Sequence, residues 1–406
     1  MTNLRRLLGL SGPTLTLGLI AALVLAYIIQ PRPLVLADDK VYDLWLRLQH
    51  PVPVSNIPVI IDLDEASLSE YGQWPWSRYL LAELIQRLEG EGAAAVGVDI
   101  LLIEPDRTSP GRVVESLEHY RGLNLDLTGL PPEMWDYDQL LADQLRQSPV
   151  VLGLFVYFDG RVSDPARPPA GPPLAYVVRS PAGGQPLEAG LTPASGASRS
   201  LPVLAEAAPV GMLNMNPGQD GVVRAVQMAA LVDDRLELGL ALVTLMTALG
   251  EETVFLQTGP YGLESLRLGD LTVPVNPDGS FNVFFKGGRR KFDYISAGDV
   301  LAGRVEPGRL AGRLAFVGTS APGLMDVRVT PFERVYPGVE VHADVLDAII
   351  TGHYLRRPPW TPAAQAGLIV LTGLLAGTAF GLARPWLYLL VGSFCRPPRS
   401  EARFIF

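Results

Sequence analysis

Two long apolar runs stand near the ends of the chain and limit what it can fold into. One extends from Leu7 to Ile29 and the other from Ala363 to Ala383. A helix that crosses a bilayer needs about 20 apolar residues, and each run supplies them. We therefore expect transmembrane helices at 7–29 and 363–383, which makes the lipid bilayer a partner of the chain. A cleaved signal peptide is the alternative for the first run, although the residues from Gln30 to Pro33 are a poor cleavage context.

Positive charge at the N-terminus predicts the orientation of these helices. Arg5 and Arg6 precede the first run, and positive residues favour the cytoplasmic side of a membrane. Residues 1–6 are then cytoplasmic, and residues 31–359 form a domain on the other side. Arg356 and Arg357 depart mildly from this rule, so the expected orientation rests on the N-terminus.

A third apolar run, from Trp386 to Phe394, is too short to cross a bilayer. Its nine residues rise about 14 Å as a helix, which is less than half of the hydrocarbon thickness of about 30 Å. A tail rich in proline and arginine follows, and it ends at Phe406. We expect residues 386–406 to be a truncated third membrane segment and its tail; a short interfacial segment is the alternative.

Composition and motifs exclude several classes of protein. The net charge of −9 argues against nucleic acid as a partner. Cys395 is the only cysteine, so neither an intramolecular disulfide nor a cysteine-based metal site is expected. The four histidines show no metal-ligand spacing, and neither a hydrolase nucleophile elbow nor a kinase signature is present. We expect no enzyme, no cofactor and no metal, and we interpret His342 as a surface or packing residue.

The residues after the first apolar run predict a βαβ unit. Val59–Leu63 is typical of a buried strand, Ser77 can cap a helix that ends near Gly90 or Gly92, and Ala94–Ile103 is again typical of a buried strand. This order implies parallel strands. Trp135–Gln147 and Val150–Phe158 then predict another helix and strand.

The second half of the domain gives a more mixed pattern. Expected elements and segments are a surface excursion at Gly160–Ser200, a strand at Val222–Leu231, a helix at Leu236–Leu249, an antiparallel meander from Leu266–Val275 with Phe281–Phe285, a strand at Leu314–Val317 and an amphipathic helix at Val339–Ile350. The predicted fold class is mixed α/β, with βαβ units and a small antiparallel meander, flanked by transmembrane helices.

Acidic residues cluster where the predicted strands end. Those near the first two strands are Asp62, Asp64, Glu65, Asp99, Glu104 and Asp106, and Asp326 follows a third strand. Ligands of open α/β sheets bind beyond the carboxyl ends of the strands. The carboxylates therefore predict a site for a cation, an amine or a hydroxyl-rich solute; strand-end caps and solvated charges are the alternative.

Two short motifs lie near the same strand ends. Trp74 and Trp76 flank Pro75 just before the predicted helix cap at Ser77. They either line a ligand pocket or pack a loop onto the core. The stretch from Gly318 to Gly323 resembles an anion-cradling loop, but it lacks the Lys-Ser/Thr ending of a P-loop, which argues against nucleotide binding.

Three stretches of the sequence resemble a known family. Residues 59–110 read VIIDLDEASLSEYGQWPWSRYLLAELIQRLEGEGAAAVGVDILLIEPDRTSP, residues 220–224 read DGVVR, and residues 316–355 read FVGTSAPGLMDVRVTPFERVYPGVEVHADVLDAIITGHYL. Together they are similar to the CHASE2 domain, an extracytoplasmic sensor module of bacterial receptors. The resemblance implies one membrane helix before the module and about three after it, followed by an adenylate cyclase, histidine kinase or serine/threonine kinase domain. This chain departs from that pattern at its end, where a helix is truncated and no output domain follows.

These observations predict a sensor in the bacterial cytoplasmic membrane that faces outward. It is expected to bind an unknown small molecule or ion and to relay the change through its membrane helices, as a possible homodimer, to an output domain. One alternative is a module that binds another envelope protein. Another is a hydrolytic site formed by the acidic cluster, with Asp62 and Asp99 as its central residues.

Overall fold

The computed structural model describes residues 12–49, 52–123, 125–127, 129–164, 169, 173–181, 184–321, 326–355 and 360–382. The chain divides into two compact units: residues Lys40–Arg356 form the larger, and Met1–Asp39 with Arg357–Phe406 form the smaller. Arg5, Arg6, the third apolar run and Cys395 lie outside the described residues. The predictions for those segments therefore stay predictions.

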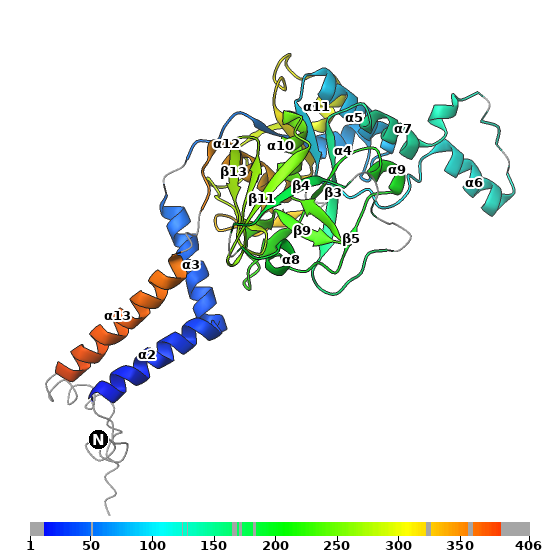
Figure 1. The fold of residues 1–406 in the computed structure, drawn as a ribbon. Helices are drawn as coiled ribbons and strands as arrows, with labels where there is room; N and C mark the ends of the chain where they lie inside the picture. The colour runs from blue at the N-terminus through cyan, green and yellow to red at the C-terminus, as the bar shows by residue number, and fades with distance from the viewer. Residues whose placement is uncertain are drawn as a thin grey trace, which may run out of the picture. The chain divides into compact units, whose positions relative to one another are not determined.

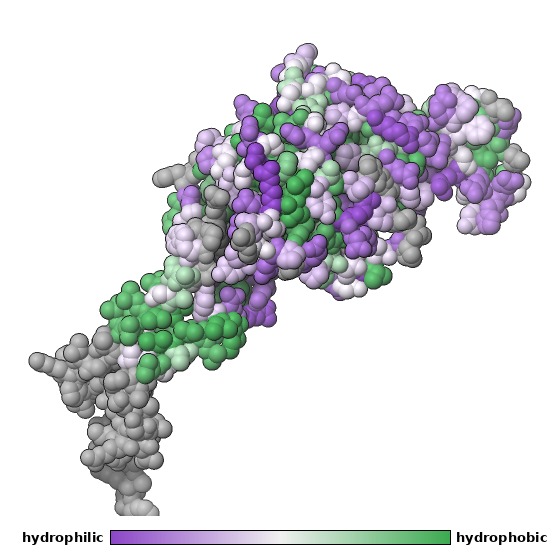
Figure 2. All heavy atoms as spheres, in the orientation of Figure 1, coloured by the Kyte–Doolittle hydropathy of each residue, from purple (hydrophilic) through white to green (hydrophobic). Residues whose placement is uncertain are grey.

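The smaller unit is built from apolar helices. In it α2 (Gly12–Ile29) and α13 (Thr361–Leu382) lie side by side (Figure 1), and the Tyr27 hydroxyl donates a hydrogen bond to the Gln365 side chain over 3.0 Å. α3 (Arg32–Leu48) begins in this unit and continues into the larger one. Large apolar side chains on α2 and α13 are exposed, and Figure 2 shows them gathered along both helices.

No single helix among the described residues is both long enough and apolar enough to cross a membrane. The part of α2 from Thr16 to Ile29 reaches the required length and composition together with α3, but the two helices meet at 77°. The two expected transmembrane helices are therefore not confirmed.

A seven-stranded sheet forms the centre of the larger unit. Its order is β15 (Asp293–Ser296), β1 (Pro58–Asp62), β16 (Leu314–Gly318), β2 (Ala95–Val98), β3 (Val150–Tyr157) and β5 (Gly196–Ser198), with β6 (Val210–Met212) also paired to β3. All of these pairs are parallel except β3 with β5. Helices connect β1 to β2 and β2 to β3, which confirms the predicted βαβ units.

Helices cover both faces of this sheet. One face packs on α4 (Glu65–Tyr71), α5 (Arg78–Gly90), α7 (Tyr137–Leu145), α9 (Pro202–Ala205) and α11 (Ala297–Leu301), and the other on α10 (Leu240–Leu249) and α12 (Gly338–Thr351). Side chains alternate between the two cores, as the pleat of a strand requires: Val59 and Ile61 join the first core, and Ile60 joins the second. α10 approaches so closely that a Cβ on Gly97 would lie 2.6 Å from Thr244 Oγ1.

Smaller sheets surround the central one. A four-stranded sheet has the order β13 (Leu271–Pro274), β12 (Gly262–Leu268), β11 (Thr253–Gly259) and β4 (Ala175–Arg179), and its inner side chains join the core around α10 and α12. The others are β14 (Ser280–Asn282) with β8 (Val223–Gln227) and β7 (Met215–Pro217), β9 (Ala229–Val232) with β10 (Arg235–Leu238), and β17 (Val327–Arg328) with β18 (Tyr336–Pro337). The remaining helices are α6 (Pro110–Arg121), a 3₁₀ turn at Pro132–Met134 and α8 (Leu187–Gly190).

Several predicted boundaries were wrong. The helix expected from Leu236 begins at Leu240, because Asp233 and Asp234 both take positive φ angles and turn the chain into the β9–β10 hairpin. The strand expected at Ala94–Ile103 ends at Val98.

Tertiary pairing corrected other predictions. β14 pairs with β8, so Phe281–Phe285 does not extend the meander; the β12–β13 hairpin within Leu266–Val275 is confirmed. The segment Gly160–Ser200 is more than a surface excursion, since it contributes β4, α8 and β5 and buries Leu187 and Ala197.

Candidate functional site

A cavity of about 660 Å³ opens at the carboxyl ends of the parallel strands. The loop after β2 forms its largest wall, from Asp99 to Thr108. Other walls come from Leu63 after β1, Phe155 of β3 and Thr319 after β16. This is where ligands of open α/β sheets bind, and the volume suits a small organic molecule.

The structure gathers six of the nine predicted site residues around this cavity. They are Trp74, Trp76, Asp99, Glu104, Asp106 and Asp326. Asp62, Asp64 and Glu65 do not line it. The cavity does not bring Asp62 and Asp99 together, and the hydrolytic alternative stays a prediction.

Of the three carboxylates outside the cavity, two are hydrogen-bonded by neighbouring residues and one faces solvent. Asp62 is buried and accepts hydrogen bonds from the Ser320 amide at 2.9 Å and hydroxyl at 2.6 Å. Burial raises its pKa. Asp64 caps α4 by accepting from the Ser67 amide at 2.8 Å, and Glu65 is exposed in the first turn of that helix. Since Ser320 holds Asp62, the Gly318–Ser320 loop anchors β16 to β1.

Asp106 fastens the cavity wall to α5. Its carboxylate accepts from the Arg78 amide at 2.6 Å and from the Thr108 amide at 2.8 Å. The Arg78 side chain donates to the Glu104 carbonyl at 2.8 Å and lies 3.3 Å from Asp138. Asp106 is therefore a positioning residue. Glu104 is exposed and pairs with Arg107 over 2.6 Å.

The two tryptophans have different environments. Trp76 is buried, donates to the Gly72 carbonyl at 2.8 Å and packs near Tyr71. Trp74 is half-buried and lies along the cavity. The packing alternative thus describes Trp76 best, and Trp74 is the one that presents an aromatic surface to a ligand.

Asp99 is the most unusual group in the cavity. Its side chain is 6% exposed, and no hydrogen bond to it is found among the described residues. The nearest ionisable neighbour is His342 of α12, whose Nε2 lies 3.7 Å away and is itself buried without a hydrogen-bond partner among those residues. Burial, helped by the negative charge of Asp326, raises the pKa of Asp99 to about 8, and burial lowers the pKa of His342 to about 3. Both side chains are therefore neutral at pH 7.

Several residues around the cavity carried no clear sequence signal. Arg78 and Phe155 occupy positions typical of an ordinary helix and strand. Arg328 sits beside Asp326 and pairs with it, which only the loop geometry reveals. His342 was expected to be a surface or packing residue, and the packing alternative is correct because α12 is buried on nearly all sides. No group of three or more metal-binding side chains occurs in the described part of the chain.

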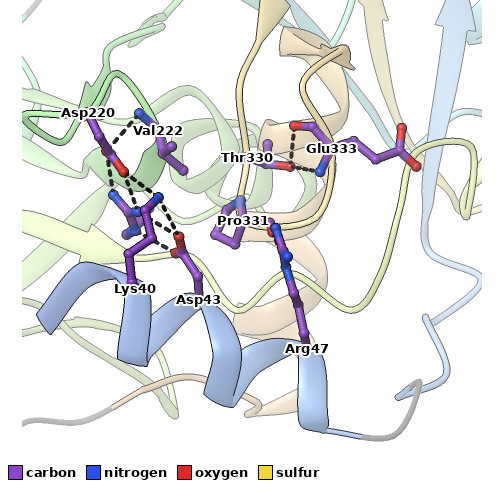
Figure 3. Close-up of polar contacts among 9 residues, drawn as sticks. Lys40, Asp43, Arg47, Asp220, Val222, Thr330, Pro331 and Glu333 are labelled. Carbon is purple, nitrogen blue, oxygen red and sulfur yellow. Dashed lines mark hydrogen bonds and ion pairs between the residues drawn. The ribbon is translucent and has the colours of Figure 1, made fainter. Parts of the chain in front are cut away.

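A second cluster joins α3 to the body of the larger unit. Arg224, in the DGVVR stretch, is buried; its guanidinium donates to Asp43 of α3 at 2.7 and 2.8 Å and to Asp220 at 2.9 Å. Lys40 of α3 also donates to Asp220, at 2.9 Å (Figure 3). Two helix residues are thus held by charge-assisted bonds, the stronger class of hydrogen bond.

One short segment connects the cavity wall to this cluster. Asp326 and Arg328 line the cavity. The next residue, Val329, bridges to Val222, and its carbonyl accepts from the Val223 amide at 2.7 Å. The carbonyl of Pro331 accepts from Arg47 of α3 at 2.6 Å (Figure 3). Residues 326–333, here called the linking segment, therefore contact both the cavity and the last turns of α3.

Comparison with family models finds the CHASE2 domain over residues 19–381. The chain belongs to the CHASE2 domain family. CHASE2 domains are typically extracellular or periplasmic sensory domains of membrane proteins, and this membership supports a sensor role. No curated protein and no solved structure matched the chain. The matched range contains the cavity, the linking segment and α3, so all three belong to the CHASE2 domain of this chain.

Proposed function

We propose that this CHASE2 protein is the sensor of a transmembrane signalling receptor in the bacterial cytoplasmic membrane. In this proposal α2 and α13 anchor the chain and Lys40–Arg356 lies outside the cytoplasm. Support comes from the large apolar side chains exposed on both helices, among them Leu25, Ile29 and Leu371, because such surfaces suit contact with lipid. The typical location of CHASE2 domains gives further support.

We propose further that a small solute bound in the cavity is the stimulus. The linking segment is the observation that carries this proposal, because a change at Asp326 or Arg328 is only a few residues from the bonds to Val223 and Arg47. Binding that favours one position of the segment changes how firmly α3 is held, and coupling of this kind acts equally in both directions. We propose no catalytic activity for the chain.

Ligand binding followed by hydrogen exchange tests this function. The purified 406-residue chain is screened by thermal shift against ions, amines, sugars and cell-wall fragments. A compound that stabilises it is expected to change amide exchange in residues 40–48, and Asp43→Asn is expected to alter the affinity of that compound. Stabilising ligands that leave exchange in 40–48 unchanged contradict the relay.

A protein-interaction module is the second candidate, and α6 favours it. This helix has no buried residue, and Figure 1 draws it at the periphery of the domain. Tyr120 in this helix is 77% exposed, and Leu123, just after its end, is 53% exposed. Crosslinking from α6 that captures one envelope protein in stoichiometric amount, in the absence of any small ligand, supports this candidate over the first.

A further inference from the structure

All the arginines that line the cavity are paired with carboxylates, whereas two of its carboxyl groups, Asp99 and Asp106, have no arginine or lysine partner among the described residues. Four acidic and three basic side chains line it: Arg78, Asp99, Glu104, Asp106, Arg107, Asp326 and Arg328. Each arginine has an acidic partner, namely Asp138 for Arg78, Glu104 for Arg107 and Asp326 for Arg328.

Asp106 is satisfied without a cation. It accepts backbone hydrogen bonds from Arg78 and Thr108 and one from the Thr108 hydroxyl at 2.7 Å. Asp99 alone remains without an ion-pair or hydrogen-bond donor among the described residues; its contact with His342, at 3.7 Å, is too long for a hydrogen bond. A buried polar group without a partner costs free energy, and a ligand that supplies a donor recovers that cost.

Aromatic and apolar side chains share the cavity with Asp99. Trp74 and Phe155 are half-buried aromatic residues of the same cavity, and Leu102 and Leu213 also line it. Aromatic faces attract organic cations, and the attraction increases where water is excluded. A carboxyl group together with aromatic side chains therefore favours an ammonium or guanidinium group over a neutral solute.

We propose that the cavity binds an organic cation, with its ammonium or guanidinium group against Asp99 and its apolar part against Trp74 and Phe155. This inference rests on the proposed sensor function and names the class of its ligand. Arg328 and Asp326 form an ion pair with each other, so Asp99 is the carboxyl left to balance the new charge of the ligand.

Binding of such a ligand is coupled to release of a proton. At pH 7 the Asp99 carboxyl of the empty cavity holds its proton, because burial keeps its pKa at about 8. The groups that face it are His342 on α12 with Asp326 and Arg328 at β17; His342 stays neutral and takes up no proton, since its pKa is about 3. An arriving cation stabilises the carboxylate, and the Asp99 proton passes to the buffer. Close to one proton is therefore released per ligand bound.

Matched ligands distinguish charge from shape. The probes are choline with its neutral analogue 3,3-dimethylbutan-1-ol, putrescine with butane-1,4-diol, and glucosamine with glucose, each titrated by calorimetry into the 406-residue chain at pH 7 in phosphate and in HEPES. At least one cation is expected to bind about tenfold more tightly than its neutral partner. The difference between the binding enthalpies measured in the two buffers is expected to correspond to release of about one proton per ligand.

Variants assign the effect to Asp99. Asp99→Asn is expected to weaken cation binding about tenfold or more and to abolish proton release, whereas Glu65→Gln, an exposed carboxylate outside the cavity, leaves both unchanged. Equal binding of the neutral partners, full binding by Asp99→Asn, or no binding of any cation up to about 10 mM overturns the inference. Amide hydrogen exchange of residues 40–48 can be compared between the unsubstituted chain and Arg328→Gln, a change at the cavity wall, without any ligand. That comparison tests the sensor function by itself, so it distinguishes failure of this ligand class from failure of the sensor function.

Discussion

At the scale of single residues, burial decides the charge of the side chains around the cavity. Asp99 and Asp344 are both buried carboxyls with raised pKa values, of about 8 and about 6. Burial is the largest cause in each case, but Asp344 is also hydrogen-bonded by Lys291 and by Tyr336 at 2.5 Å. Asp99 has no such donor among the described residues, so its ionisation responds most strongly to what enters the cavity.

Asp99→Asn tests this electrostatic account through the pH dependence of stability. Between about pH 4, where a free aspartate titrates, and about pH 8, the folded chain keeps a proton that the unfolded chain has lost. The contribution of Asp99 to the stability of the folded chain therefore falls as pH rises through this window, by up to about 1.4 kcal/mol per pH unit. Asparagine does not titrate, so the melting temperature of the variant minus that of the unsubstituted chain is expected to rise from pH 5 to pH 8 and to level off above.

The difference between the two proteins isolates Asp99, because Asp344 titrates in both. Glu65→Gln, whose carboxylate is exposed, serves as the control and is expected to follow the unsubstituted chain. Parallel melting profiles of Asp99→Asn and the unsubstituted chain across pH 5–8 contradict a raised pKa at this position.

At the scale of elements, α12 is held by buried ion pairs. Lys286 Nζ lies 2.5 Å from Asp347 of α12, with both side chains almost fully buried, and donates to the Thr351 hydroxyl at 3.1 Å. Lys291 pairs with Asp344 at 2.9 Å. Asp347 also accepts from the Ser55 amide at 2.8 Å, which ties the chain between α3 and β1 to the same helix.

Lys286→Met is expected to destabilise the larger unit by about 3–5 kcal/mol, because it leaves Asp347 buried without its cation. Chemical unfolding measures the change. Arg304→Gln removes a partly exposed arginine that pairs with Glu70 and Asp299, so it is expected to cost less than about 1 kcal/mol. Equal effects of the two substitutions would show that the buried pair has no special role.

These pairs also explain what the sequence could and could not predict. The observed end of α12 at Thr351 is one residue beyond the predicted end at Ile350, because the left-handed Gly352 ends the helix locally. Its nearly complete burial was not predicted, because Asp344 and Asp347 are neutralised by lysines more than 50 residues earlier in the chain. The hydrophobic pattern within the helix does not reveal ion pairs with such distant lysines.

The candidate site was likewise predicted only in part from the sequence. The carboxyl ends of the strands were predicted as the site, and six of nine residues lie there. The sequence around Asp62 and Asp64 does not distinguish them from the cavity residue Asp99, since all three follow or end buried strands. Their partners, Ser320 and Ser67, are set by tertiary contacts and by a helix cap.

At the scale of the whole molecule, the account rests on one physical connection. The linking segment contacts the cavity through Asp326 and Arg328, and it holds α3 through the bond from Arg47 to Pro331. Arg224 and Asp43 provide a second attachment of the same helix. Coupling between two sites needs an element that both sites bias, and the linking segment is that element in this proposal.

The most direct test compares two arginines that both line the cavity. Arg328→Gln removes the partner of Asp326 and is expected to loosen the linking segment. Arg107→Gln alters an arginine that is 85% exposed and whose one ion-pair partner among the described residues is Glu104. The measurement is amide hydrogen exchange of residues 40–48 in the 406-residue chain. The account predicts exchange at least about threefold faster in Arg328→Gln and unchanged in Arg107→Gln. Exchange that is the same in both variants and in the unsubstituted chain would contradict the coupling of the cavity to α3.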